Sequence, residues 1–304
     1  MIDIDGLIGR FAVWMAGPNF RNPYSQATIR IYGFTARRFL EYVYFDGVME
    51  ASEISIHLVR KFVLNGHDNT IVPKNTQTVR LSALVLFFEY LKSNDEISTN
   101  PAWAFIDDQK RKRGGHGGNS ATRLKPVLEW DEIDRLRFEA GRFETIAGLR
   151  DAALIGLILD TGLRASEVCA LTAANGEGYL VGRLRVIGKG NKERLVRFEP
   201  SHAPQVQSWI RTRQRMFAHA ERLFVTNQGN PLTIGILYMI VKRLLERTGI
   251  KKAQQGPHLL RHTAASIWLA TGVELKQVQE NLGHSNIGTT SRYLHLLAKR
   301  HHEI

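Results

Sequence analysis

A basic, glycine-rich segment near the middle of the chain indicates that the chain folds as two separately packed domains. Residues 107–126 read DDQKRKRGGHGGNSATRLKP, and from Gln109 to Lys125 this stretch holds six lysines and arginines, four glycines and no acidic residue. It shows no apolar periodicity, and its glycines favour a flexible backbone. A chain of 304 residues is long enough for two domains. The expected division is a first domain, a flexible basic linker and a second domain over residues 1–106, 107–125 and 126–304.

The charge balance of the chain favours a polyanionic partner. Its 41 lysines and arginines outnumber its 29 aspartates and glutamates, giving a formal net charge of +12. Nucleic acid is the leading partner, and an anionic membrane surface is the alternative. No uninterrupted apolar run approaches the roughly 18 residues that span a bilayer, and the start MIDIDGLIGRF lacks the basic residues that open a signal peptide. We therefore expect no membrane partner and a cytoplasmic protein, associated with the nucleoid if its partner is DNA.

Helical periodicity dominates the first hundred residues. The stretch SQATIRIYGFTARRFLEYVYF begins with an N-cap at Ser25, and its apolar residues, including Ile31 and Phe34, predict a buried stripe beside a basic side. NTQTVRLSALVLFFEYLKS predicts a second long helix of the same design, which the following Asn-Pro ends. The first domain is therefore expected to be a helical bundle, with shorter helices over residues 4–16 and 55–65.

Only one part of the chain predicts strands. In YLVGRLRVIGKGNKERLVRFEP, apolar residues alternate on both sides of GKGN, which supplies the glycines and asparagine that a hairpin turn needs. Lys189 is therefore expected at the tip of a β-hairpin, where a lysine taken alone is usually solvated and inert. The expected fold class is mainly α, with a helical first domain and a mostly helical second domain that contains a small hairpin sheet.

Two further motifs of the second domain place polar side chains beside glycines at helix ends. DTGLRASEV puts Arg164 where one helix ends and the next begins. GPHLLRHTAASIWLATG opens a helix at a proline and places His258 and Arg261 three residues apart, hence on one face. Each residue also has a purely structural interpretation, since Arg164 can pair with Glu167 and His258 can cap its helix.

The last motifs lie close to the C-terminal end. VELKQVQENLGHS predicts an amphipathic helix ended by Gly283, with His284 just past its end. GTTSRYLHLLAK predicts a short helix that carries Tyr293 on its second turn, where packing is the ordinary role of a tyrosine. The ordered set of two arginines, two histidines, a lysine and a tyrosine, each beside a helix end or hairpin tip, indicates more than packing.

This set resembles the tyrosine recombinase, or phage integrase, family, which includes Xer-type and Cre-type enzymes. The resemblance covers about residues 126 to 295, where TGLRASE, GKGNKER, HLLRH, LGHS and SRYLH occur in the family's order and at its intervals. It implies a supporting acidic residue, Glu167, and six catalytic residues: Arg164, Lys189, His258, Arg261, His284 and the nucleophile Tyr293.

The activity implied by the resemblance is cleavage and rejoining of double-stranded DNA through a covalent 3′-phosphotyrosyl link. The arginines and His284 would stabilise charge on the phosphate oxygens, His258 would accept the proton of Tyr293, and Lys189 would protonate the leaving 5′-oxygen. Neither metal nor ATP is needed, so no cofactor is expected. The resemblance further implies a core-binding first domain and a homotetramer on two paired copies of a specific recombination site.

The linker is expected to contact the phosphate backbone, because it joins two domains of a basic protein. The alternative is an inert solvated hinge. The residues that would make these contacts are Lys110, Arg111, Lys112, Arg113, Arg123 and Lys125.

Other functions remain as alternatives. A type IB topoisomerase or a telomere resolvase would use similar residues, and a non-catalytic DNA-binding regulator would share the fold but have a damaged active site. His258 and His262 have the i, i+4 spacing of a zinc pair, but Leu259 stands where a zinc hydrolase needs glutamate. The single cysteine, Cys169, lies in the apolar pattern SEVCAL and is expected to be a small core residue without chemistry.

Overall fold

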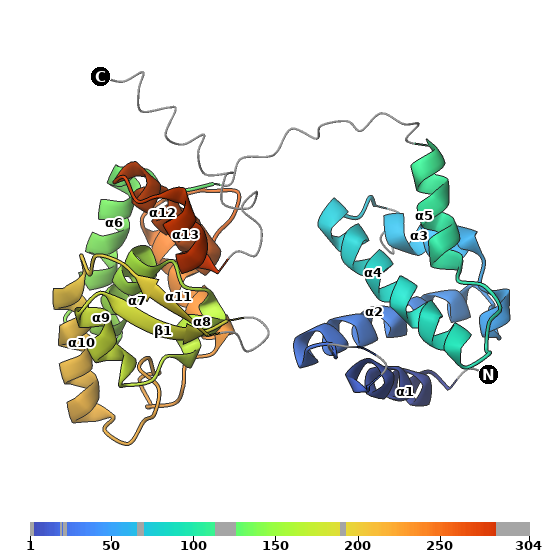
Figure 1. Ribbon diagram of the computed structural model, residues 1–304, viewed down its shortest axis with the longest axis horizontal. Helices are drawn as coiled ribbons and strands as arrows, with labels where there is room; N and C mark the ends of the chain where they lie inside the picture. Colours follow the sequence, from blue (N-terminus) through green and yellow to red (C-terminus); the bar gives the residue numbers. More distant parts are fainter. Residues whose placement is uncertain are drawn as a thin grey trace. The chain divides into compact units, whose positions relative to one another are not determined.

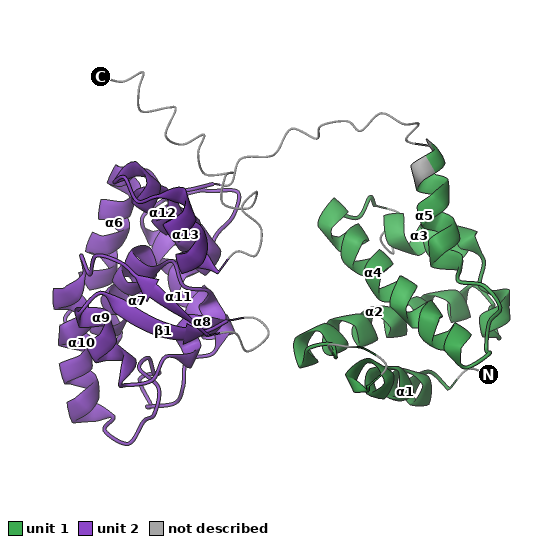
Figure 2. Cartoon of the chain, in the orientation of Figure 1, with its two compact units in different colours: residues 1–118 green, residues 119–304 purple. Residues whose placement is uncertain are grey.

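The computed structural model describes residues 3–18, 20, 23–65, 70–112, 126–188 and 193–283. The chain divides into two compact units, residues 1–118 and 119–304 (Figure 2), and each unit has its own hydrophobic core. Both are mainly helical, and within the described ranges there is one two-stranded sheet (Figure 1). None of the helices in these ranges has the length and apolar character needed to cross a membrane. The expected fold class, mainly α with a small hairpin sheet, is confirmed.

Unit 1 is a helical bundle around an aromatic core that includes Phe11, Phe39, Phe87 and Phe88, all fully buried. As expected, Ser25 caps the second helix, because its Oγ accepts a hydrogen bond of 3.2 Å from the amide of Thr28. The elements of this unit are α1 (Ile4–Ala16), α2 (Gln26–Phe45), the 3-10 turn η1 (Ala51–Glu53), α3 (Ile56–Leu64), α4 (Lys74–Ser93) and α5 (Pro101–Lys112).

The buried face of α2 differs from the expected one. Ile31 and Phe34 are 51% and 61% exposed, and Arg38 lies over the Phe34 ring. Small residues take part in the buried face: Gly33 is buried and faces Ile8 of α1, where an added Cβ would lie at ordinary contact distance, 3.6 Å from Cγ2 of Ile8. Because glycine carries almost no hydrophobic signal, the sequence pattern did not mark Gly33 as part of the buried face. The buried residues are Ile29, Gly33, Thr35, Ala36, Phe39, Leu40 and Val43.

Helix α5 extends into the segment expected to be linker. It begins after Asn100, whose Oδ1 accepts a 3.0 Å hydrogen bond from the amide of Ala102, and buries Phe105 in the core of unit 1. Asp108 forms an ion pair with Arg60 of α3. Lysine, arginine and glutamine are good helix formers, so the charged end of this stretch continues the helix that the apolar part begins. The linker prediction is therefore wrong for residues 107–112, and the rest of it, 113–125, lies outside the described residues.

Unit 2 is built around α7, which is buried on all sides and packs against α6, α10 and α12. Its close contact with α10 is set by Gly156, where an added Cβ would lie 2.5 Å from Cβ of His202. The elements of this unit are α6 (Trp130–Gly141), α7 (Ile146–Thr161), α8 (Ala165–Ala170), α9 (Asn175–Leu180), β1 (Arg183–Ile187), β2 (Glu193–Arg197), α10 (Ala203–Met216), α11 (Ile234–Arg247), α12 (Pro257–Ala270) and α13 (Leu275–Leu282).

A buried polar cluster fixes the C-terminal half of α7. The carboxylate of Asp160 lies 2.7 Å from Nδ1 of His202 and accepts a 3.0 Å hydrogen bond from the His202 amide, and the hydroxyl of Tyr179 also donates to it. Burial, together with the nearby carboxylate, raises the pKa of Tyr179, so its hydroxyl stays a donor. These bonds join α7 to α9 and to the start of α10, just before the turn that carries Arg164.

The predicted β-hairpin is confirmed. β1 and β2 pair antiparallel, with Ile187 opposite Glu193. The loop between them comprises residues 188–192, and Lys189 in this loop lies outside the described part of the chain.

Candidate active site

The turn between α7 and α8 positions Arg164. Helix α7 ends at Thr161, and Gly162 takes a left-handed conformation (φ 58°, ψ 23°) that strains residues with a Cβ. Arg164 is the N-cap of α8: its amide donates to Oε2 of Glu167 over 2.8 Å, and its Nη1 donates to Oε1 of the same residue over 3.0 Å. The Arg164 side chain is 30% exposed. The structure therefore places Arg164 at the expected helix junction, in an ion pair that leaves part of its guanidinium group accessible.

Arg261 on α12 joins the ends of two other helices. The residue is only 3% exposed. Its Nη1 donates to the carbonyl of Gly162 and its Nη2 donates to the carbonyl of Leu282, both over 2.6 Å. Carbonyls at the C-terminal end of a helix lack partners within the helix and carry partial negative charge, so a guanidinium group is well suited to bind them. Arg261 thereby holds the end of α7 against the end of α13.

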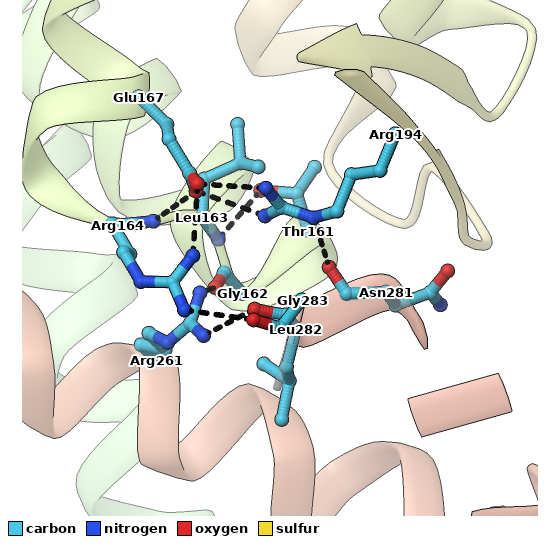
Figure 3. A network of polar contacts seen from close by, with 10 residues as sticks. All are labelled: Thr161, Gly162, Leu163, Arg164, Glu167, Arg194, Arg261, Asn281, Leu282 and Gly283. Carbon is cyan, nitrogen blue, oxygen red and sulfur yellow. Dashed lines mark hydrogen bonds and ion pairs between the residues drawn. The ribbon is translucent and has the colours of Figure 1, made fainter. Parts of the chain in front are cut away.

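The two arginines meet at the end of α13. Nη2 of Arg164 donates to the carbonyl of Gly283 over 3.1 Å, and Arg261 binds the carbonyl of the preceding Leu282. Figure 3 shows the two guanidinium groups beside these adjacent carbonyls. Gly283 ends α13 in a left-handed conformation, as its sequence predicts, and its peptide bond leads directly to His284. The structure thus brings together two of the predicted site arginines at the point where the chain enters its last motifs.

The carboxylate of Glu167 has a second partner that the sequence analysis did not identify. Nη1 and Nη2 of Arg194, on β2, donate to its two oxygens over 2.7 and 2.9 Å. The Glu167 side chain is 3% exposed and the Arg194 side chain 14% exposed. Arg194 shares the inward face of the hairpin with the buried Val196, so an arginine at an inward position of the ERLVR alternation is the signal that could have indicated a buried partner.

The surroundings of Glu167 alter its ionisation. Burial alone would raise the pKa of this carboxyl group, but the hydrogen bonds and charges of Arg194 and Arg164 outweigh burial and hold that pKa below its ordinary value of 4.5. Glu167 therefore remains a carboxylate at neutral pH and holds two guanidinium groups.

Acid is expected to remove stabilisation by this carboxylate. The pKa of Glu167 is lower in the folded chain than in the unfolded chain. The ionised group therefore stabilises the fold at pH values above the ordinary pKa, and this contribution is lost as pH falls through the pKa of the folded chain. We expect the free energy of unfolding of Glu167→Gln to fall less steeply than that of the wild type from about pH 5 downward. Urea unfolding at a series of pH values measures the slopes. Glu177→Gln, at an exposed position in α9, is the control, and equal slopes for Glu167→Gln and wild type would contradict the prediction.

His258 lies in the first turn of α12 and is exposed, whereas Arg261 one turn later is buried. The helix enters through Gly256 at φ 102°, where an added Cβ would lie 2.6 Å from the ring of Tyr238. The rings of His258 and His262 have their centroids 6.4 Å apart. The start of the helix at a proline is confirmed. His258 and Arg261 lie three residues apart on this helix, as expected, but His258 is exposed to solvent and Arg261 is buried in the core.

The remaining candidates cannot be placed in the site. Lys189, His284 and Tyr293 lie outside the described residues, as do the linker residues Arg113, Arg123 and Lys125. The other linker candidates, Lys110, Arg111 and Lys112, form the last turn of α5. Cys169 packs half-buried against the core of unit 2, and burial raises the pKa of its thiol to about 11, so it is a poor nucleophile at neutral pH. Among the described residues no group of three or more histidine, cysteine, aspartate or glutamate side chains is arranged to hold a metal ion.

The sequence of the second unit is similar to that of a known protein family. Residues 126–300, more than half of the chain, match the phage integrase family. The chain belongs to this family. It is similar to tyrosine recombinase XerC of Haemophilus influenzae (strain 86-028NP), with 33% identity over 241 residues that cover 78% of this chain and 76% of that protein. It is also similar to tyrosine recombinase XerD of Rhizobium meliloti (strain 1021), with 34% identity over 241 residues that cover 76% of this chain and 73% of that protein.

Solved structures show the same fold. The XerH site-specific recombinase bound to a palindromic difH substrate, in a post-cleavage complex, matches with a TM-score of 0.73 and 20% identity over 98% of this chain and 93% of that chain. A lambda integrase dimer bound to a COC′ core site matches with a TM-score of 0.66 and 15% identity over 95% of this chain and 94% of that chain. The family match and the similarity to tyrosine recombinases together show that the protein is a site-specific DNA recombinase of the tyrosine class.

Proposed function

We propose that this tyrosine recombinase cuts and rejoins a specific double-stranded DNA site through a covalent 3′-phosphotyrosyl link to Tyr293. The observation that carries the proposal is the meeting of Arg164 and Arg261 at the end of α13, one residue before His284. Through this contact the fold joins three separate sequence motifs of the predicted site.

The proposed role of the arginines follows from the chemistry of the phosphodiester. Its non-bridging oxygens are negative, and their charge increases on the way to a pentavalent transition state. Guanidinium donors fixed in advance stabilise such charge without having to reorganise during the reaction. Arg164 is fixed by Glu167 and the carbonyl of Gly283, and Arg261 by the carbonyls of Gly162 and Leu282. His284 would add another donor.

Two proton transfers complete the proposed reaction. A phenol with a pKa near 10 is almost fully protonated at neutral pH, so His258, which is exposed at the start of α12, accepts the proton of Tyr293. The tyrosine oxygen bonds to phosphorus as the bond to the 5′-oxygen breaks, and Lys189 on the hairpin loop protonates that oxygen. A 5′-hydroxyl of a second strand then attacks the phosphotyrosine and releases Tyr293. Because each step exchanges one phosphate ester for another, neither ATP nor metal is required.

Rejoining to a new partner distinguishes a recombinase from a type IB topoisomerase, a telomere resolvase or a regulator of the same fold. We propose a homotetramer on two paired sites, associated with the nucleoid through its DNA. Expressing the chain beside its native flanking DNA and sequencing the junctions tests this function. Exchanged junctions that disappear with Arg261→Ala support recombination, whereas relaxed plasmid or closed hairpin ends without exchange would support the other strand transferases.

We also propose that unit 1 is the core-binding domain and that the basic segment from Gln109 to Lys125, which begins in the last turn of α5, binds the DNA backbone. Replacing Lys110, Arg111, Lys112 and Arg113 with glutamine should weaken binding to specific and unrelated DNA alike, because phosphate contacts carry no sequence information. The logarithmic dependence of affinity on salt should become shallower, by about 0.9 for each phosphate group that the variant no longer neutralises. Glutamine keeps the helix propensity of this end of α5.

A titration of labelled duplex at several salt concentrations measures this slope. The matched control exchanges lysine and arginine at the same four positions, which keeps every charge, and its slope should equal that of the wild type. An unchanged slope in the glutamine variant would show that these four residues do not contact the DNA backbone.

A further inference from the structure

Arg194 contacts both Glu167 and the end of α13. It reaches inward from β2, binds both Glu167 oxygens and donates from Nε to the carbonyl of Asn281 over 2.9 Å. An added Cβ on Gly283 would lie 3.1 Å from Nε of Arg194, so the guanidinium group lies directly against the end of α13. Figure 3 shows Glu167 between the two arginines.

The contacts of the carboxylate are divided unequally between the two guanidinium groups. Arg194 makes the bidentate, shorter pair at 2.7 and 2.9 Å, whereas the side chain of Arg164 makes one bond of 3.0 Å to Glu167. Bidentate charge-assisted bonds are the stronger arrangement. One negative charge is thus shared by two positive charges, and the more exposed of the two, Arg164, is the less closely paired.

This division has a consequence for phosphate binding. If Glu167 had Arg164 as its sole guanidinium partner, a buried carboxylate would neutralise that arginine and would repel an approaching phosphate. With Arg194 present, the three side chains carry a net positive charge.

We propose that Arg194 is a positioning residue for DNA cleavage: by binding both oxygens of Glu167, it prevents Glu167 from neutralising Arg164, whose charge then acts on the scissile phosphate. This proposal rests on the proposed role of Arg164 in cleavage. The proposed effect of Arg194 is indirect: it acts through Glu167 and does not contact the reacting atoms.

The test measures the rate of covalent adduct formation by the full chain on a nicked duplex at saturating DNA. Arg194→Met, which keeps an unbranched side chain against Gly283 but removes the charge, is expected to react about tenfold to a hundredfold more slowly. Adding Glu167→Gln removes the carboxylate that would neutralise Arg164, so the double variant should react several-fold faster than Arg194→Met. Arg197→Met, an exposed arginine on the same strand, is the matched control and should react at nearly the wild-type rate.

A structural role alone would make the rates follow the stabilities of the variants, since removing the second partner of a buried ion pair can either add damage or relieve it. Urea unfolding of each variant separates the two cases, and the proposal requires the double variant to react faster than Arg194→Met without a matching gain in stability. A double variant that reacts no faster than Arg194→Met therefore overturns the proposal. Should Arg194→Met fail to fold, as judged by circular dichroism, Arg194→Lys carries the same comparison: it keeps the charge but loses the two-oxygen geometry, and Glu167→Gln should again restore rate, by a smaller factor. If the wild type forms no adduct, the proposed function itself fails; if it does and Glu167→Gln gives no gain, only the role of Arg194 fails.

Discussion

Tyr293→Phe is expected to abolish covalent attachment of the chain to DNA. The substitution removes one oxygen, the nucleophile of the proposed reaction, and leaves an aromatic ring of nearly the same size. The single cysteine, Cys169, is not expected to replace it, since its thiol is half-buried and burial raises its pKa. With a suicide duplex that loses a short strand after cleavage, the wild type should give a protein–DNA band that resists denaturation, and Tyr293→Phe should give none.

Two controls make this result specific. Tyr238→Phe removes the hydroxyl of a partly exposed tyrosine of the same unit, whose ring contacts Gly256 at the start of α12, and should leave the band intact. Addition of EDTA should also leave the wild-type band unchanged, because the proposed mechanism uses no metal. A band that persists in Tyr293→Phe, or one that requires a divalent cation, would contradict the assignment of the nucleophile.

Local sequence signals were sufficient for the elements that carry the site. The glycines of GKGN between two alternating segments predicted the β1–β2 hairpin, and the glycine of TGL and the proline of GPH predicted the junctions that place Arg164 and His258. Each signal is a backbone requirement of its own few residues, such as a positive φ or a missing amide proton, so it is visible without knowledge of the fold.

The misses have a different origin, because each depends on a partner far away in sequence. Glu167 and Arg194 are 27 residues apart, and neither motif contains information about the other. The buried face of α2 includes Gly33, which faces Ile8 of α1 and has no side chain to mark it. Helix α5 was missed because its charged second half resembles a linker in composition, while Phe105 and Asp108 attach it to the core of unit 1 and to α3. In each case, contacts between residues distant in sequence determine the burial or the helix boundary that local composition does not predict.

The proposed general acid predicts a rate loss that depends on the leaving group. If Lys189 protonates the 5′-oxygen, Lys189→Ala should slow cleavage of an ordinary phosphodiester by about a hundredfold or more, as expected for loss of general acid catalysis. A 5′-bridging phosphorothiolate places sulfur at the leaving position, and a thiol has a pKa of about 8.5, so its anion departs without a proton donor. Cleavage of this substrate by Lys189→Ala should approach the wild-type rate.

The matched variants determine whether this recovery is specific to protonation. Lys192→Ala removes a second lysine from the same loop between β1 and β2 and should cleave both substrates at nearly the wild-type rate. Arg164→Ala and Arg261→Ala should be slow on both substrates, because the arginines act on the non-bridging oxygens, which the sulfur substitution leaves unchanged. Equal defects of Lys189→Ala on the two substrates would instead remove Lys189 from the acid role. His258, exposed at the start of α12, would then be the next residue to test.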